Sequence, residues 1–193
     1  MSVDTSDVNL VGDEVVLNVA RAALMAALTG AFAYISFPIP FSSVPFSMQV
    51  LGVFLAGLLL GPVWGGASMA LYLLAGAVGA PVFQGGAAGV GHLFGSTAGY
   101  LWSYLFAAVI IGFIAHGGLE IKPAEELPVP QMVVGLLVGT AVIYGLGVLG
   151  LIVIADLGAM AALTAGALVF IPGELLKIAA AVAIVRSDRL VAA

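Results

Sequence analysis

The sequence predicts an all-α membrane protein with six transmembrane helices. Hydrophobic residues make up 63% of the chain and charged residues only 8%, whereas soluble domains carry about a quarter charged residues. No Asp, Glu, Lys or Arg occurs from Ala22 through Leu119, a stretch several times longer than the roughly 20 residues of one helical crossing. Segments such as LGVFLAGLLL do not alternate apolar and polar residues, as the strands of a membrane β-barrel do.

The chain divides into an acidic cytoplasmic tail, residues 1–15, and a single six-helix transmembrane domain, residues 16–187. The beginning of the chain, MSVDTSDVNLVGDEVV, is acidic and lacks the basic region of a signal peptide. We therefore expect a soluble tail rather than a cleaved leader.

The first predicted span covers residues 16–36 and ends before FPIPFSSVPF, whose three prolines stop a helix and stiffen the connection. The second, residues 48–60, stops at Gly61-Pro62 and at about 1.5 Å per residue barely crosses a bilayer. The next three spans are predicted at residues 63–80, 93–115 and 131–155.

The last predicted span covers residues 156–185 and contains Pro172 near its middle. One interpretation is a short apolar piece, residues 157–170, followed by a helix that restarts at Pro172, because proline suits the first position of a helix. The other is one long kinked helix. The sequence leaves both open.

Basic residues predict the orientation. With six spans and both termini inside, every basic residue outside the sixth span lies on the cytoplasmic side, and the connections 37–47, 81–92 and 156–159 contain no Lys or Arg. This agrees with the positive-inside rule, so we expect a multi-pass protein of the cell membrane with both termini cytoplasmic. The four basic residues outside the sixth span are Arg21, Lys122, Arg186 and Arg189.

Small residues recur at four-residue spacing in the first span, as in Ala22-xxx-Ala26 and Ala23-xxx-Ala27. Such spacing lets helix backbones approach closely in lipid. Packing inside the bundle is the favoured interpretation. The sharper one is a docking surface for another membrane subunit, with Ala22 and Ala26 as the candidate residues.

Several function classes are disfavoured. The chain has no cysteine, and neither of its two lysines stands in a Gly-Lys-Ser/Thr phosphate-binding loop. No basic patch suggests nucleic acid, and the histidines and acids make a poor metal-ligand set. An intramembrane hydrolase with Ser96 as nucleophile and His92 as base is an alternative, but interfacial histidines are favoured. We expect no enzyme activity, no metal and no cofactor.

Glu174 and Lys177 are the charges that need an explanation. Each costs about 2.5–3.5 kcal/mol near the middle of a bilayer. Three residues apart on a helix, they share one side and partly neutralise each other, and Glu174 lies in the first turn if the helix begins at Pro172. They form either an ion pair that only locks helices together or, as we favour, a polar site for a small ligand.

An ordered set of motifs resembles the BioY family, the biotin-specific S components of energy-coupling-factor transporters. The resemblance covers about residues 20–187 and implies an S-component-like bundle that binds biotin. It also implies three partners, a transmembrane coupling protein and two cytosolic ATPases. The motifs are VPFSMQ (44–49), LAGLLLGP (55–62), YLLAG (72–76), GAPVF (79–83), GSTAGY (95–100) and IPGELLK (171–177).

The sequence departs from the family pattern in three places. Glu174 stands where the family usually has aspartate, Ser96 and Ala98 replace proline and glycine, and Ser47-Met48 replaces threonine-leucine. The longer arm of Glu174 alters the expected ligand distance more than the ligand's identity.

The chemistry of biotin suits the candidate residues. Glu174 can accept a hydrogen bond from a ureido N–H, and Lys177 can donate to a ligand oxygen. Phe83 and Tyr100 can pack on the bicyclic ring, although core packing is equally expected. Gln84 or Gln49 can add a polar contact, and for Gln49 a helix-capping or interhelical hydrogen bond is the alternative. An S component for thiamine or riboflavin and a purely structural membrane protein remain the rival hypotheses.

Overall fold

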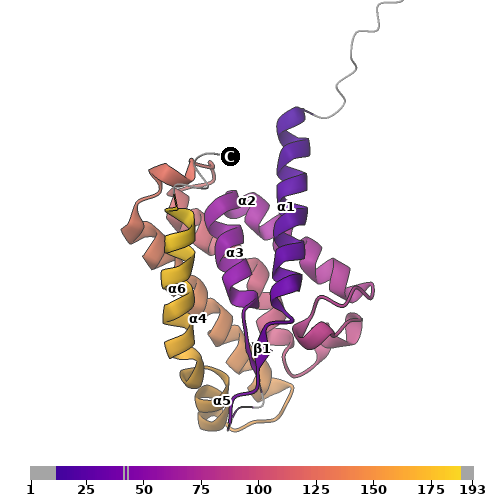
Figure 1. Cartoon of the computed structure of the whole chain (residues 1–193). Coiled ribbons are helices and arrows are strands. Elements are labelled where there is room, and N and C mark those ends of the chain that lie inside the picture. Colours follow the sequence, from indigo (N-terminus) through magenta and orange to yellow (C-terminus); the bar gives the residue numbers. More distant parts are fainter. Residues whose placement is uncertain (1–11, 41, 43, 188–193) are drawn as a thin grey trace, which may run out of the picture.

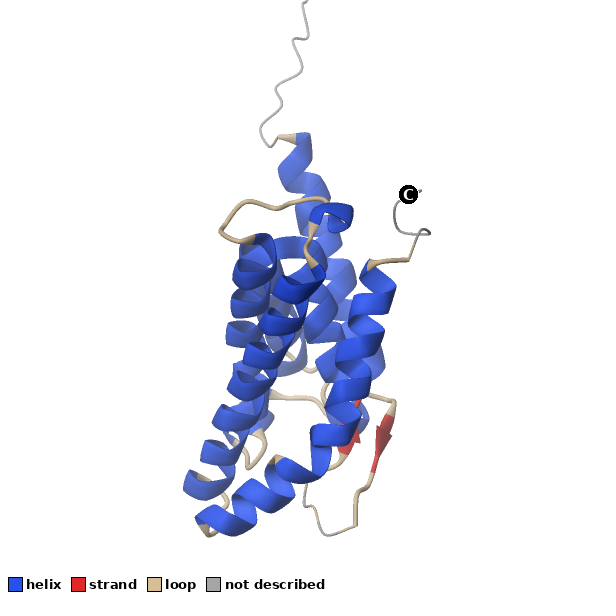
Figure 2. Ribbon diagram, turned by 90° about the vertical axis from the view of Figure 1, so that its left-hand side faces the viewer, coloured by secondary structure: helices blue, strands red, loops and turns tan. Residues whose placement is uncertain are grey.

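The protein is a bundle of long helices that lie roughly side by side (Figures 1 and 2). The computed structural model describes residues 12–40, 42 and 44–187. Short 3-10 helices occupy Gln84–Gly86 (η1), Val90–Phe94 (η2), Ala124–Glu126 (η3) and Leu168–Phe170 (η4). The main elements are α1 (Asp13–Phe32), β1 (Ser36–Phe37), β2 (Phe46–Ser47), α2 (Gln49–Ala77), α3 (Ala98–His116), α4 (Val129–Val153), α5 (Ala159–Gly166) and α6 (Ile171–Val185).

Five described helical stretches are long and apolar enough to cross a membrane: α1, α2, α3, α4 and the combined stretch of α5 and α6. The predicted all-α membrane class is therefore confirmed. The count of six spans holds only when the two arms of α2 are counted separately. Boundaries also differ by a few residues; for example, the first predicted span extends to residue 36, whereas α1 ends at Phe32.

The helix α2 folds back on itself at Gly61. Gly61 has φ 69° and ψ −173°, a conformation that is not helical and that favours glycine. The side-chain amide of Gln49 donates to the hydroxyl of Tyr72, although 23 residues of straight helix span about 35 Å. The two arms, residues 49–60 and 62–77, are thus a helical hairpin, as the Gly61-Pro62 signal predicted.

A buried histidine, His116, replaces a backbone hydrogen bond that is lost at this break. Pro62 has no N–H, so the carbonyl of Leu58, four residues earlier, loses its helical donor. The backbone N–H of Lys122 donates to Nδ1 of His116 at 2.9 Å, which leaves the proton on Nε2, and Nε2 donates to the Leu58 oxygen at 3.0 Å. The structure needs a glycine at Gly112, because a Cβ there would meet the backbone of Gly61 and Pro62.

The final span is broken rather than kinked. Helix α5 ends at Gly166, Ala167 adopts φ −136° and ψ −59°, and the single turn of η4 leads into α6. Pro172 lies in the first turn of α6. Of the two interpretations left open by the sequence, the helix that restarts at this proline is the one the structure adopts.

The start of α1 and the end of α6 lie at the same end of the bundle (Figure 1). There, Arg186 donates to the carbonyl oxygens of Leu127 at 2.7 Å and Glu125 at 3.2 Å. The antiparallel β1–β2 hairpin and α5 lie at the opposite end (Figure 2). Residues 1–11 of the predicted acidic tail and Arg189 lie outside the described residues. Asp13 and Glu14, which are also part of the predicted tail, belong to the first turn of α1.

The candidate docking surface on the first span needs a correction. Helix α1 packs against α2, and Ala22 and Ala26 are 0% and 8% exposed within this chain. Ala23 and Ala27 lie on the exposed face. Ala22 and Ala26 therefore serve internal packing, the interpretation that the sequence favoured, and are not available to a partner.

Candidate ligand-binding site

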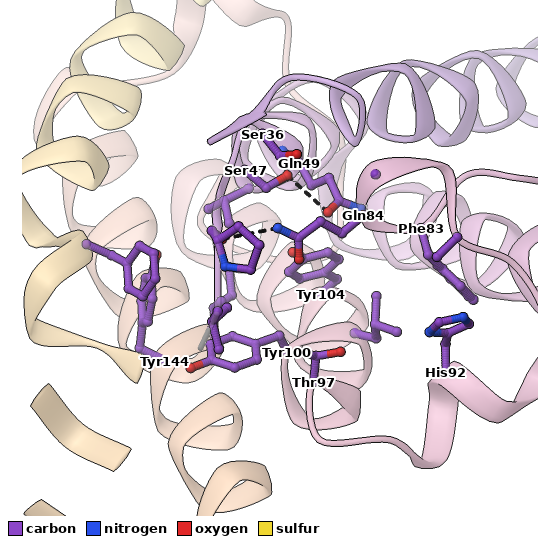
Figure 3. Close-up of a pocket in the computed structure, with 18 of the residues that line it drawn as sticks. Ser36, Ser47, Gln49, Phe83, Gln84, His92, Thr97, Tyr100, Tyr104 and Tyr144 are labelled. Atoms are coloured by element: carbon purple, nitrogen blue, oxygen red, sulfur yellow. Dashed lines mark hydrogen bonds between the residues drawn. The ribbon is translucent and has the colours of Figure 1, made fainter. Parts of the chain in front are cut away.

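A cavity of about 300 Å³ lies beside the β1–β2 hairpin, between α2, α3, α4 and α6. Its volume is at the small end of the range for sites that hold small molecules. Aromatic rings and polar side chains both point into it (Figure 3). Besides its tyrosines, the polar side chains in its lining are Ser36, Ser47, Gln49, Gln84, His92, Thr97 and Lys177.

Glu174 and Lys177 form a buried ion pair at one side of this cavity. They are 2% and 3% exposed, and Nζ of Lys177 donates to Oε1 of Glu174 at 2.6 Å. Nζ also donates to the carbonyl oxygen of Ser47 at 2.6 Å and lies 3.9 Å from the ring centre of Phe46. The pair joins α6 to the hairpin, and each charge offsets the cost of burying the other. Lys177 lines the cavity, and Glu174 is hydrogen-bonded to it.

The two oxygens of Glu174 have different surroundings. Oε1 accepts from Lys177 and also from the hydroxyl of Tyr144, at 2.8 Å. Oε2 is buried and has no hydrogen-bond partner among the described residues. Buried polar atoms in native structures are nearly always paired. Glu174 therefore keeps one acceptor oxygen without a donor among the described residues, next to two side chains, Lys177 and Tyr144, that line the cavity.

Gln49 belongs both to the cavity and to the connection between the arms of α2. It is 2% exposed and lines the cavity. The hydroxyl of Ser47 donates to Oε1 of Gln49 at 3.0 Å, and the Gln49 amide donates to Tyr72. The interhelical hydrogen bond considered from the sequence is therefore present, and it holds the amide at the cavity wall.

The two predicted aromatic residues also line the cavity. Phe83 is 2% exposed, and its ring meets that of Tyr72 edge to face at 5.6 Å. Tyr100 donates its hydroxyl hydrogen to the Gly166 carbonyl at 2.6 Å, and its ring lies 6.1 Å from that of Tyr144. Each ring thus has a place in the core and a face on the cavity.

Gln84 connects the two segments that cover this end of the bundle. Its Nε2 donates to the carbonyl oxygen of Pro45 at 3.2 Å, which joins η1 to the chain just before β2. Figure 3 shows its amide between the hairpin side and Tyr104.

The structure brings the predicted residues together. Gln49, Phe83, Gln84, Tyr100 and Lys177 share the lining of one cavity, and Glu174 is paired with Lys177. The sequence reasoning missed Tyr144 and Tyr104 as site residues. Tyr144 carried a usable signal, because it is a polar-tipped aromatic in the almost wholly apolar run of the fifth predicted span. Tyr104 did not stand out among its aromatic neighbours.

The arrangement around Ser96 and His92 is not that of a hydrolase. No hydrogen bond joins these two side chains within the described part of the chain, and the His92 ring packs against Phe83 with centroids 5.9 Å apart. Over the same residues, no group of three or more His, Asp or Glu side chains lies together as metal ligands.

The chain is similar to known proteins over most of its length. The family model described as the BioY family matches residues 4–192. The chain is 36% identical over 172 residues to a probable biotin transporter BioY of Pyrococcus horikoshii, covering 89% of this chain and 94% of that protein. It is 38% identical over 133 residues to a probable biotin transporter BioY of Lysinibacillus sphaericus, covering 68% of this chain and 63% of that one. The crystal structure of an S-component for biotin from an ECF-type ABC transporter superposes with a TM-score of 0.82 and 29% identity, covering 93% of this chain and 94% of the other.

Proposed function

Since the chain belongs to the BioY family, we propose that it binds biotin in the membrane and mediates biotin uptake as the S component of an energy-coupling-factor transporter. It is a multi-pass membrane protein and, like its relatives, a transporter subunit rather than an enzyme. The observation that carries the proposal is the unpaired Oε2 of Glu174, buried beside a cavity of small-molecule size.

The ureido group of biotin matches the polar side of this cavity. One ureido N–H donates to Oε2 of Glu174, which gives that oxygen its missing partner. Lys177 uses two of its three donor hydrogens within the protein, and the third is available to a ligand oxygen. A hydrogen bond to a charged group is worth about 1.5–3 kcal/mol, so this contact supplies a large part of the selectivity.

The apolar part of the ligand meets the aromatic side chains. Phe83 and Tyr100 are held by their own packing and hydrogen bonding, so little side-chain entropy is lost when a ring system is placed against them. Gln49 and Gln84 then supply amide groups at the wall, each already oriented by a partner.

The proposed transport direction follows from the two ends of the bundle. The termini side, with Lys122 and Arg186, is the cytoplasmic side by the positive-inside rule. The cavity lies at the other end, beside the β1–β2 hairpin (Figure 2), so it receives biotin from outside.

The energy for transport comes from other subunits in this proposal. Lys122 and Lys177 are the only lysines of the chain, and neither belongs to a nucleotide-binding loop. A transmembrane coupling protein and two cytosolic ATPases supply the missing function. The exposed face of α1 with Ala23 and Ala27 replaces Ala22 and Ala26 as the candidate contact with the coupling protein.

Equilibrium binding of biotin to the purified full-length protein tests the proposal. We expect saturable biotin binding that excess thiamine or riboflavin does not displace. Glu174→Gln should weaken binding about 10- to 100-fold, because a neutral amide replaces the charged acceptor. Glu125→Gln is the matched control, since Glu125 is exposed on η3 at the other end of the molecule. A wild-type protein that binds another vitamin and ignores biotin would overturn the assignment.

A further inference from the structure

His92 lines the same cavity as Lys177 but lies away from the buried ion pair. We propose that His92 binds the carboxylate of the ligand at the mouth of the cavity and so selects for an anionic tail; this inference rests on the proposed biotin function. Within the described lining, Lys177 and His92 are the two side chains able to carry positive charge.

Lys177 is a poor partner for the ligand carboxylate. Its charge is balanced by Glu174 at 2.6 Å, and the second Glu174 oxygen has no donor in the part of the chain that the structure describes. A carboxylate placed there would put two negative groups beside one cation in a buried site, which leaves one negative charge uncompensated. Both the charge balance and the unpaired oxygen favour the neutral ureido end of biotin at this position.

His92 stands at the other side of the cavity. Figure 3 shows Tyr144, which donates to Glu174, at one edge of the site and His92 at the opposite edge, with Tyr100, Tyr104 and Thr97 between them. His92 is exposed, whereas Glu174 is 2% exposed. A carboxylate is costly to bury and keeps part of its hydration at an exposed rim. A ligand with its ureido end at Glu174 therefore extends its tail toward His92.

The local structure holds the imidazole in place. His92 lies on η2, and its ring packs against Phe83, which itself lines the cavity. The indole N–H of Trp102 donates to the carbonyl oxygen of Leu93 at 3.1 Å, which fastens η2 to α3. Across the described residues the His92 side chain makes no hydrogen bond, so its ring N–H groups are free to donate to a ligand.

A histidine at this position makes the binding of an anionic tail depend on pH. Imidazole changes charge between about pH 5 and 8, whereas carboxylates, phenols and lysines ordinarily titrate outside that range. The other titratable groups that line the cavity are Lys177, Tyr100, Tyr104 and Tyr144. Because a protonated imidazole attracts a carboxylate, the proposed contact predicts tighter biotin binding at pH 5.5 than at pH 8.

Biotin and biotinamide separate this contact from the rest of the site, because they share the ureido ring and differ in the charge of the tail. The experiment measures equilibrium binding of both ligands to the full-length protein at pH 5.5 and pH 8, for the wild type, His92→Gln and His92→Lys. We expect the ratio of biotin to biotinamide affinity in the wild type to fall about two- to fivefold between these pH values, the range of a solvent-exposed ion pair.

The variants provide the decisive comparison. His92→Gln should show the low ratio at both pH values, and His92→Lys should keep the high ratio at both. Binding of biotinamide reports that each variant is folded. A wild-type ratio that ignores pH, or a His92→Gln ratio equal to that of the wild type at pH 5.5, overturns the role of His92 while the biotin function stands. A wild type that binds neither ligand overturns the proposed function itself.

Discussion

Both ends of this bundle bury polar side chains, but they satisfy them to different degrees. At the termini end, His116 is 1% exposed and uses both ring nitrogens, one toward Leu58 and one toward Lys122. At the hairpin end, Glu174 is similarly buried, yet one of its carboxylate oxygens has no partner among the described residues. The first arrangement is complete within the protein. The second is complete only when something else donates a hydrogen bond.

The difference separates a structural role from a binding role. A buried polar group that is fully paired restores what the fold itself has broken, here the carbonyl left free by Pro62. A buried charge that is only partly paired lowers the stability of the empty protein and gains a partner when ligand binds. Variants at the two ends should therefore affect stability and ligand binding in different proportions.

The largest expected effect is at the ion pair. Lys177→Met leaves the Glu174 carboxylate buried without a counter-charge, which should cost about 3–5 kcal/mol of stability and abolish measurable biotin binding. Thermal unfolding in detergent and equilibrium biotin binding measure the two effects.

A double variant distinguishes the loss of charge from the loss of shape. Glu174→Gln combined with Lys177→Met removes both charges, so most of the stability should return while biotin binding stays absent. If the double variant bound biotin like the wild type, the polar side of the cavity would have no role in recognition.

The next largest effect is expected at His116, at the end of the bundle where this buried side chain is fully paired. His116→Ala leaves the buried Leu58 carbonyl without its partner, which costs about 1–3 kcal/mol, whereas the N–H of the exposed Lys122 can turn to water. The unfolding temperature should fall, and the biotin affinity of the folded protein should stay within about twofold of wild type, since His116 does not line the cavity. A His116→Ala variant that kept its stability and lost biotin binding would contradict a purely structural role for His116.

The smallest effect tests the second donor to Glu174. Tyr144→Phe removes the hydroxyl that donates at 2.8 Å while Lys177 still donates to the same oxygen. Biotin affinity should fall about two- to tenfold, the equivalent of roughly 0.5–1.5 kcal/mol for one hydrogen bond.

Tyr34→Phe is the matched control for this variant. Its hydroxyl also donates one hydrogen bond, to the Pro81 carbonyl at 2.7 Å, but Tyr34 is 59% exposed and does not line the cavity. If the two phenylalanine variants weakened binding equally, the Tyr144 hydroxyl would have no specific part in the site.

Much of the fold could be predicted from local sequence signals. The long uncharged stretch predicted a membrane bundle, Gly61-Pro62 predicted the break in α2, and Pro172 predicted the start of α6. The candidate site was predictable where polar residues stood out against an apolar background, as Glu174, Lys177 and Gln49 do. The ligand-site roles of Tyr144 and His92 needed the structure, because the residues that each contacts, Glu174 and Phe83, lie far away in the sequence.

The two faces of α1 show where the sequence stops being informative. Ala22 and Ala26 on one face and Ala23 and Ala27 on the other have the same residue type and spacing, yet the first pair is buried and the second exposed. In a soluble protein an outward face would carry polar residues, but lipid is as apolar as the protein interior. Hydrophobicity therefore cannot tell which face packs inward.

By itself the sequence determined that the chain enters a membrane, where its helices break, and that an acid and a base lie on one turn of the last helix. These properties depend on composition and on residues within a few positions of one another. Only the tertiary structure decided which faces of the helices meet, that side chains from α2, α3, α4 and α6 enclose one cavity, and that one oxygen of Glu174 stays unpaired beside it. Those properties depend on packing between segments far apart in the chain, and an apolar sequence in an apolar solvent carries little record of that packing.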